Sequence, residues 1–202
     1  MTLVSFYYRR NIMSKSEDKK QFIVDNAIEV FKEKGFKDVT MKDIIDRCNI
    51  SRGGIYLYFK NTQEIFEEVI KKEENNDKSL LLISQNLSNL DIIKYFLEEV
   101  KKELLNKNNN LIVATYEYIF YKFNNKENLN LSKKYSIAYE TLYKIIQNGI
   151  KNKEFKVEIN KTINHIIFLL EGLRISSLVI PLNEKIIDEQ IENILRDFKI
   201  EK

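Results

Sequence analysis

The chain of 202 residues is 44% hydrophobic and 31% charged, a composition typical of a globular protein and not of a disordered or membrane-spanning one. Five Gly and one Pro leave few residues for tight hairpins, bulges or phosphate-binding loops, so the composition favours an all-helical (all-α) fold. One Cys and one His exclude an intrachain disulfide and the zinc or di-iron sites that need several such ligands, and we expect no metal and no cofactor.

The net charge of +3 is unevenly distributed along the chain. Residues 1–62 carry 12 basic and 8 acidic side chains, whereas residues 63–202 carry 21 and 22. A basic excess at one end suits a small nucleic-acid-binding module joined to a nearly neutral body, because attraction to phosphates depends on local charge. The single Cys and the lack of a signal-peptide pattern lead us to expect a cytoplasmic protein with no membrane partner.

Residues 1–14 show no helical periodicity. We interpret them as a flexible N-terminal arm or, alternatively, as an extension upstream of a natural start at Met13. Purine-rich codons for Arg9 and Arg10 would place a bacterial ribosome-binding site just before Met13. The sequence leaves both interpretations open.

A helix-turn-helix unit is predicted in residues 15–62. Its first helix ends before Gly35, a residue that favours the left-handed conformation at a helix end. Thr40 can cap a short second helix, and Asn49 tolerates the sharp turn that ends it. Ser51 then begins a third helix, so that two short helices are braced by a longer one.

The remaining residues, 63–202, are predicted to form a helical body. Asn61 and Glu64 are spaced to cap the start of a helix that runs to about Glu74 and joins the two units. Asn-rich or Gly-containing stretches separate the later helices, which we expect near residues 78–87, 91–105, 110–123, 131–148, 160–180 and 184–198.

The segment beginning at Ser51 carries the groups that DNA binding requires. Gly53 and Gly54 remove side-chain bulk, so the backbone can approach DNA closely. Arg52 can bind a guanine edge or clamp a phosphate through two hydrogen bonds. Further donors for phosphate oxygens follow at Tyr56, Tyr58 and Lys60. An ordinary packing helix with a solvated face is the alternative interpretation of the same residues.

One set of residues in this segment follows a known DNA-binding pattern in order and spacing: Ala27, Phe31, Gly35-Phe36, Thr40, Asp43-Ile44, Ser51-Arg52-Gly53, Tyr56, Tyr58-Phe59-Lys60-Asn61 and Glu64-Ile65-Phe66. Through these residues, the segment 20–66 resembles the DNA-binding domain of the TetR/AcrR family of transcriptional regulators. The sequence departs from the family pattern at two places: Cys48-Asn49-Ile50 replaces the usual Ala-Gly-Val, and Gly54 replaces Thr, Ser or Ala, which removes one hydroxyl or methyl that can contact DNA.

The resemblance implies a two-fold symmetric homodimer that represses transcription from a palindromic double-stranded DNA operator until a small-molecule effector binds the C-terminal body. The recognition helices of such a dimer enter successive major grooves about 34 Å apart or a multiple of it. We expect effector binding to tilt the helix at 61–74 and so change this spacing. The resemblance assigns DNA contacts to Thr40, Lys42, Ser51, Arg52, Gly53, Gly54, Tyr56, Tyr58 and Lys60.

The resemblance also suggests that the helices at 160–180 and 184–198 pair with their copies in a four-helix dimer interface; an ordinary intrachain seam is the alternative. Gly172 permits close helix approach, and Glu171 and Arg174 are spaced for an ion pair within or between subunits. The residues assigned to this interface are Glu171, Gly172, Arg174, Ile191 and Ile194.

The effector site is less defined by the sequence, because aromatic residues at helical spacing form protein cores more often than ligand pockets. We expect a mainly aromatic pocket for a hydrophobic or planar ligand. His165 lies in an apolar helix, where we expect a packed core or interface residue, with ligand contact as the alternative. The candidate ligand-binding residues are Tyr95, Tyr116, Phe120, Tyr139, Tyr143, His165 and Phe168.

Other classes of function fit these residues less well. A helical enzyme is not predicted, because the sequence shows no nucleophile with a base partner, no cluster of metal ligands and no glycine-rich phosphate loop. A DNA-binding architectural protein without an effector and a purely dimeric interaction module are the remaining alternatives.

Overall fold

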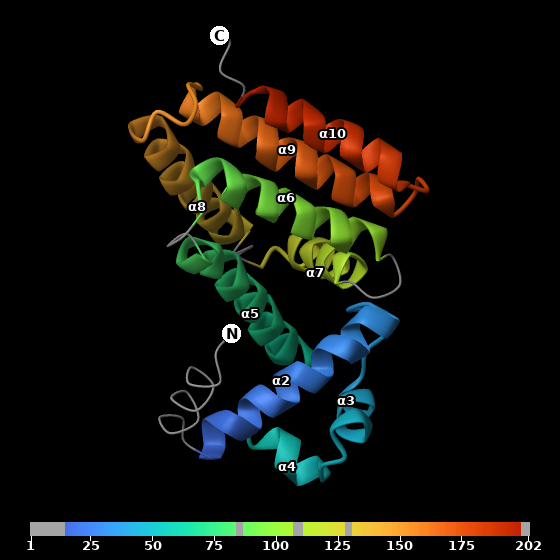
Figure 1. The fold of residues 1–202 in the computed structure, drawn as a ribbon. Coiled ribbons are helices and arrows are strands. Elements are labelled where there is room, and N and C mark those ends of the chain that lie inside the picture. Colours follow the sequence, from blue (N-terminus) through green and yellow to red (C-terminus); the bar gives the residue numbers. More distant parts are fainter. Residues whose placement is uncertain (1–14, 84–86, 107–110, 128–130, 199–202) are drawn as a thin grey trace.

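Helices make up the regular secondary structure of residues 15–83, 87–106, 111–127 and 131–198, which are the residues that the computed structural model describes. The predicted all-α fold is confirmed, whereas the N-terminal arm at 1–14 lies outside the described residues. The helices, labelled as in Figure 1, are α2 (Lys15–Lys34), α3 (Met41–Cys48), α4 (Arg52–Tyr56), α5 (Thr62–Ile83), α6 (Asn89–Leu105), α7 (Ile112–Asn124), α8 (Leu131–Lys151), α9 (Ile159–Ser177) and α10 (Glu184–Arg196).

The helix-turn-helix unit forms from local signals in the sequence. Gly35 follows α2 with φ of +77°, and Asn49 follows α3 with φ of +49°, so both chain reversals use left-handed backbone. Thr40 and Asp43 form a complete capping box at the start of α3. Ser51 accepts a hydrogen bond from the Gly54 amide at the start of α4.

The core of this unit extends past residue 62, where we expected the domain to end. Ile44, Ile55 and Phe59 bury the inner sides of α3 and α4 against α2. Phe66 of α5 and Ala114 of α7 complete the same hydrophobic cluster. The N-terminal unit is therefore built on two helices that also belong to the body.

The body has its own core, made mainly by α6, α8, α9 and α10, with Ile112 of α7. Helix α6 contacts α8, α9 and α10, and α9 also packs against α8 and α10. In Figure 1, α9 and α10 lie at the end of the molecule farthest from α3 and α4. Among the described helices, none has the length and apolar character needed to cross a membrane.

One predicted boundary was wrong, and another lies a few residues from its expected place. The polar stretch around Asn75 was expected to separate two helices, but α5 continues through it to Ile83. Asn costs a helix less than 1 kcal/mol relative to Ala, roughly, and the packing of α5 against α8 and α6 outweighs this. At the other end of the chain, α9 stops at Ser177 and not at residue 180, because Pro181 disfavours helical backbone before it.

We predict that Gly149→Ala destabilises the protein although Ala favours helix. A Cβ at this position in α8 would lie 2.1 Å from Cζ of Phe155, whose ring is 3% exposed. The clash should cost about 1–3 kcal/mol of unfolding free energy, measured by urea denaturation. Gly53→Ala is the control, because an added Cβ there meets nothing within 4 Å. Equal stability of the two variants would contradict the prediction.

Candidate DNA interface

The residues assigned to DNA lie on α3, on α4 and in the turns around them. Ile55 and Phe59 fix α4 from behind, with 0% and 2% of their surfaces exposed. Between them, Tyr56 points outward and is 43% exposed. Tyr58 is only partly exposed, because it also packs against the N-terminal core. Gly54 is likewise partly exposed, whereas the remaining candidates are exposed: Thr40, Lys42, Ser51, Arg52, Gly53 and Lys60.

The start of α3 is held by Thr40 and Asp43. The Thr40 hydroxyl donates to Oδ2 of Asp43 at 2.7 Å and accepts from the Asp43 amide at 3.3 Å. Hydrogen bonds from Lys34 and from Thr40 lower the pKa of Asp43 to about 2, so this carboxylate is charged at neutral pH. Thr40 therefore positions α3 and has already used its hydroxyl proton. Lys42, two residues after Thr40, is exposed.

The recognition segment α4 presents hydrogen-bond donors at the surface, where other side chains of the protein do not crowd them. The guanidinium carbon of Arg52 lies 5.8 Å from the centre of the Tyr56 ring, so the two side chains share one surface. A Cβ at Gly53 would meet nothing within 4 Å, which means that packing inside the protein does not require glycine there. A Cβ at Gly54 would lie 3.2 Å from Oγ of Ser51, so this glycine makes room for the helix cap.

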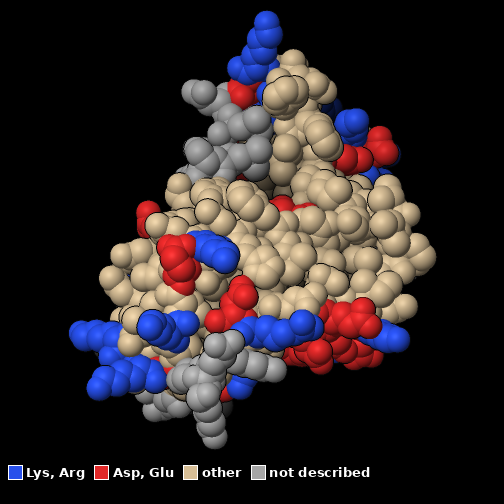
Figure 2. All heavy atoms as spheres, turned by 90° about the horizontal axis from the view of Figure 1, so that it is seen from above, with Lys and Arg blue, Asp and Glu red and all other residues tan. Residues whose placement is uncertain are grey.

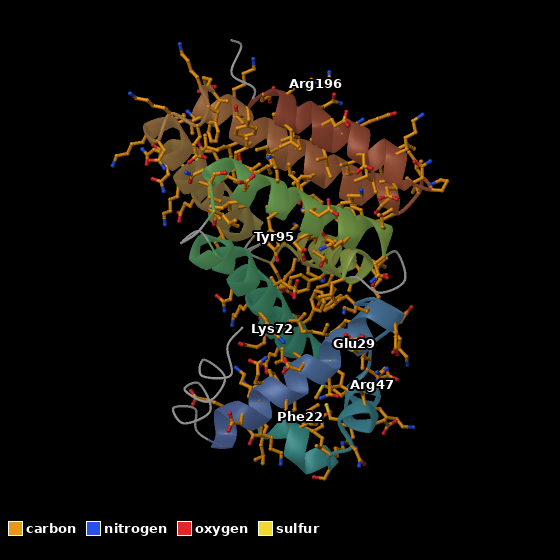
Figure 3. The ribbon with its side chains drawn as sticks, viewed as in Figure 1. Phe22, Glu29, Arg47, Lys72, Tyr95 and Arg196 are labelled. Atoms are coloured by element: carbon orange, nitrogen blue, oxygen red, sulfur yellow. The ribbon has the colours of Figure 1, made fainter. Side chains whose placement is uncertain are left out.

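Three cations of this surface have no acidic partner among the described residues. Within the described residues, Lys42, Arg52 and Lys60 form no ion pair, whereas Lys34 pairs with Asp43 and Arg47 with Glu33. Figure 3 shows Arg47 on α3. Unpaired cations next to exposed hydroxyls favour the binding of a polyanion such as DNA, because each phosphate that a cation neutralises releases condensed counterions.

One carboxylate of the body holds the end of α2. Oε2 of Glu117, on α7, accepts hydrogen bonds from the amides of Phe36 at 2.6 Å and Lys37 at 3.1 Å. Any Cβ at Gly35 would lie 2.5 Å from the same oxygen, so both the backbone angle and the close approach require glycine there. A second tie joins α5 to α2, where Lys72 lies 2.5 Å from Asp25 (Figure 3).

A polar network fastens α5 to α7 beside this contact. Oε1 of Glu67 accepts from the Tyr118 hydroxyl at 2.9 Å and from Gln63 at 3.1 Å, and it lies 3.0 Å from Nζ of Lys122. Burial alone would lower the pKa of Lys122, but its contacts with Glu127 and Glu67 raise it. Burial and the bond to Glu67 raise the pKa of Tyr118. Lys122 therefore stays charged and Tyr118 stays protonated at neutral pH, and the network ties α5 to α7.

The aromatic residues proposed for the effector do not share one environment. Tyr116 and Tyr139 pack against the body's core, and their hydroxyls donate to Glu171 and Asn160. Tyr143 stacks on Tyr139 with ring centres 6.5 Å apart. The others are exposed: Tyr95 on α6 (42%, Figure 3), Phe120 on α7 (55%), and His165 and Phe168 (66%) on α9.

The expectation that His165 packs in the protomer's own core is wrong, whereas a place in an interface stays a prediction. Its ring faces solvent, with Nδ1 2.7 Å from Oδ2 of Asp197, so it links α9 to the end of α10. The neighbouring Phe168 is exposed on α9 together with Ile175, and Val179 just after the helix is exposed as well; the last two are 44% and 81% exposed. We therefore assign Phe168 to an outer surface and not to a ligand pocket.

The candidate dimer residues are divided between core and surface. Ile194 is fully buried in its own protomer, so it offers nothing to a second copy and leaves the proposed interface. Arg174 pairs within the chain, at 2.7 Å from Glu171 and 3.1 Å from Glu103. Gly172 is exposed with open space around it, and Ile191 is partly exposed.

The face that carries these residues is poor in charge. Figure 2 views the molecule from the end where α9 and α10 lie; uncharged residues fill much of the middle of this face, and Lys, Arg, Asp and Glu gather towards its edges. Apolar side chains exposed along and just after α9 are Phe168, Ile175, Leu178, Val179 and Ile180. An apolar patch of this kind marks a surface that a partner covers.

Comparison with known proteins shows which family the sequence matches. Residues 23–69 match the family described as bacterial regulatory proteins, tetR family, and residues 92–188 match the tetracyclin repressor-like C-terminal domain. The HTH-type transcriptional regulator YfiR of Bacillus subtilis is 32% identical over 150 residues, which are 72% of each chain. The biofilm operon icaADBC negative transcriptional regulator IcaR of Staphylococcus aureus is 34% identical over 82 residues, 40% of this chain and 44% of IcaR.

Solved structures share the fold. A TetR-family regulator from Agrobacterium tumefaciens superposes with a TM-score of 0.73 at 10% identity, covering 91% of this chain and 99% of the other. A TetR-family regulator from Cytophaga hutchinsonii superposes with a TM-score of 0.69 at 20% identity, covering 94% and 99%. The arrangement of α2 to α10 is thus common to chains of very different sequence.

We predict that Glu117→Ala loosens the N-terminal unit from the body. The variant leaves the amides of Phe36 and Lys37 without their acceptor, which should lower the unfolding free energy by about 1–3 kcal/mol. Urea denaturation measures this loss. Glu117→Gln is the matched control, because it keeps one acceptor oxygen and should lose less. The assignment fails if both variants are as stable as the wild type.

Proposed function

The chain belongs to the TetR family of bacterial regulatory proteins, and from this premise we propose that it is a repressor that binds a palindromic operator as a homodimer and is released by a small-molecule effector. As a family member it is a DNA-binding transcriptional regulator of the helix-turn-helix type and not an enzyme. The proposal concerns the finer points: the sign of regulation, the symmetry of the site, the contacting residues and the signal.

The observation that carries the proposal is the composition of the α4 surface. Arg52 and Lys60 are exposed and unpaired within the described residues, and they flank Tyr56 on a segment that Ile55 and Phe59 hold rigidly from behind. A guanidinium fork on a fixed support suits a guanine edge, and an ammonium suits a phosphate as a point charge. Repression is supported by IcaR, which is named as a negative regulator.

A homodimer is supported by the apolar outer side of α9. Phe168, Ile175 and Val179 would lose their contact with water against a second copy, and Gly172 between them would let the helices approach closely. Of the two isoleucines that we assigned to the interface from the sequence, Ile191 of α10 is retained. Because Arg174 and Glu171 are paired within the protomer, we propose that they border this interface without an ion pair across it.

The effector is proposed to act on the body next to α5 and α7. Tyr116 and Tyr139 are the candidates that face the body's core, so we retain them as the ligand-contacting pair, with Tyr143 beside Tyr139. A ligand that separates α7 from its neighbours would shift Glu117 and with it the end of α2. The lever is therefore α5 and α7 together, because the network around Glu67 joins them.

The direct test is a footprint of the full-length protein on the intergenic DNA next to its own gene. We expect one protected palindrome and binding that falls steeply as salt rises. Thermal melting against a library of small molecules then finds the effector, since a ligand of the folded state raises the melting temperature. An architectural protein would instead protect DNA without sequence preference, and an interaction module would protect none.

We predict that Arg52→Ala weakens operator binding by about 1–3 kcal/mol while binding to random DNA changes little, because a base contact is lost. Fluorescence anisotropy with both duplexes measures the two affinities. Lys60→Ala is the comparison: a phosphate contact supports both complexes, so both should weaken by a similar factor. If Arg52→Ala binds operator and random DNA as the wild type does, Arg52 does not read bases.

We predict that Ile175→Glu converts the dimer to monomers, because a carboxylate in an apolar interface loses its hydration. Sedimentation equilibrium measures the molecular mass. Val113→Glu is the matched control: Val113 is 45% exposed on α7, against 44% for Ile175 on α9. The control should stay dimeric. Dimeric Ile175→Glu, or two monomeric variants, would contradict the interface on α9.

A further inference from the structure

Leu57 is an exposed apolar residue on the candidate DNA interface that packing inside the protein does not explain. It caps the C-terminal end of α4 and is 81% exposed, while Ile55 and Phe59 on either side of it are buried. A leucine in this position buries little apolar surface within its own fold, and its side chain is free to contact a partner. The motif resemblance leaves this position undefined, so the sequence pattern does not explain it either.

The surroundings of Leu57 are those of the DNA-facing surface. Tyr56 precedes it with 43% exposure, and Arg52 lies over the Tyr56 ring. Gly53 lies four residues before Leu57, one helical turn away on the same side of α4, and has open space where a side chain would be. The bulk missing at Gly53 lets a partner come close enough to touch Leu57.

We propose that Leu57 contacts the 5-methyl group of a thymine in each operator half-site and so determines part of the operator's sequence. This inference rests on the proposed operator binding. Phosphates favour polar and charged donors, and most base atoms exposed in the major groove are donors or acceptors; the thymine methyl is the apolar group that base edges present there. Leu57 is continuous with Arg52 and Tyr56, so the duplex is the occupant that this surface fits.

The test replaces thymines of the operator with deoxyuridine, which pairs identically and lacks the methyl group. Full-length wild-type protein should bind about fourfold more weakly when one particular thymine in a half-site is replaced, as expected for one buried methyl. Leu57→Ala should bind the methylated and the unmethylated operator with equal affinity. Because Leu57 has few internal contacts, this variant should melt at the wild-type temperature.

Lys60→Ala serves as the control for a general loss of affinity. It should bind both operators more weakly yet keep the fourfold ratio between them. The proposal is overturned if no thymine replacement weakens the wild type, or if Leu57→Ala keeps the wild-type ratio. If either result is obtained while the footprint is sequence-specific, only the role of Leu57 is overturned. If no footprint is found, the operator proposal is overturned as well.

Discussion

The structure depends on an aromatic cluster that belongs to both units of the molecule. The Phe36 ring, just after α2, packs against Phe66 of α5 at 5.2 Å and against Tyr118 and Tyr121 of α7 at 5.1 and 5.4 Å. Burial of such rings is among the largest single gains a fold can make. The core of the DNA-binding unit is therefore completed by α5 and α7, which ties the orientation of this unit to these two helices.

This constraint decides how a signal can pass through the chain. A ligand changes DNA affinity only if it binds one arrangement of the two units better than the other. Glu117 joins α7 to the end of α2 by two hydrogen bonds, and the Glu67 network joins α7 to α5. Movement of either helix thus reaches α2, which carries α3 through a shared apolar core. The hydrocarbon contacts keep α2, α3 and α4 rigid, so the recognition surface would move as a whole.

The sequence predicted what depends on neighbouring residues and missed what depends on distant ones. Caps at Thr40 and Ser51 and left-handed turns at Gly35 and Asn49 are local, and the structure has all four. Glu117 could not be found, because its partners lie 81 and 80 residues away and a lone Glu on a helix carries no signal. The same reason explains the continuous α5: packing against α8 is invisible in the Asn-rich stretch that suggested a break.

The surface residues likewise separate into features that the sequence predicted and features that depend on distant contacts. Periodicity predicted that Ile194 and Phe168 lie on helices, but it could not tell which side of each helix faces the protomer's own core. Ile194, which we expected at the dimer interface, is buried, and Phe168, which we expected in the ligand pocket, is exposed. Arg52, Lys60 and Leu57 were left exposed by a segment whose other side is completely buried. Within the described residues, no acidic side chain pairs with these cations and no side chain covers this leucine, so the proposed DNA partner would supply both negative charge and a small apolar group. A duplex containing thymine supplies both within one groove.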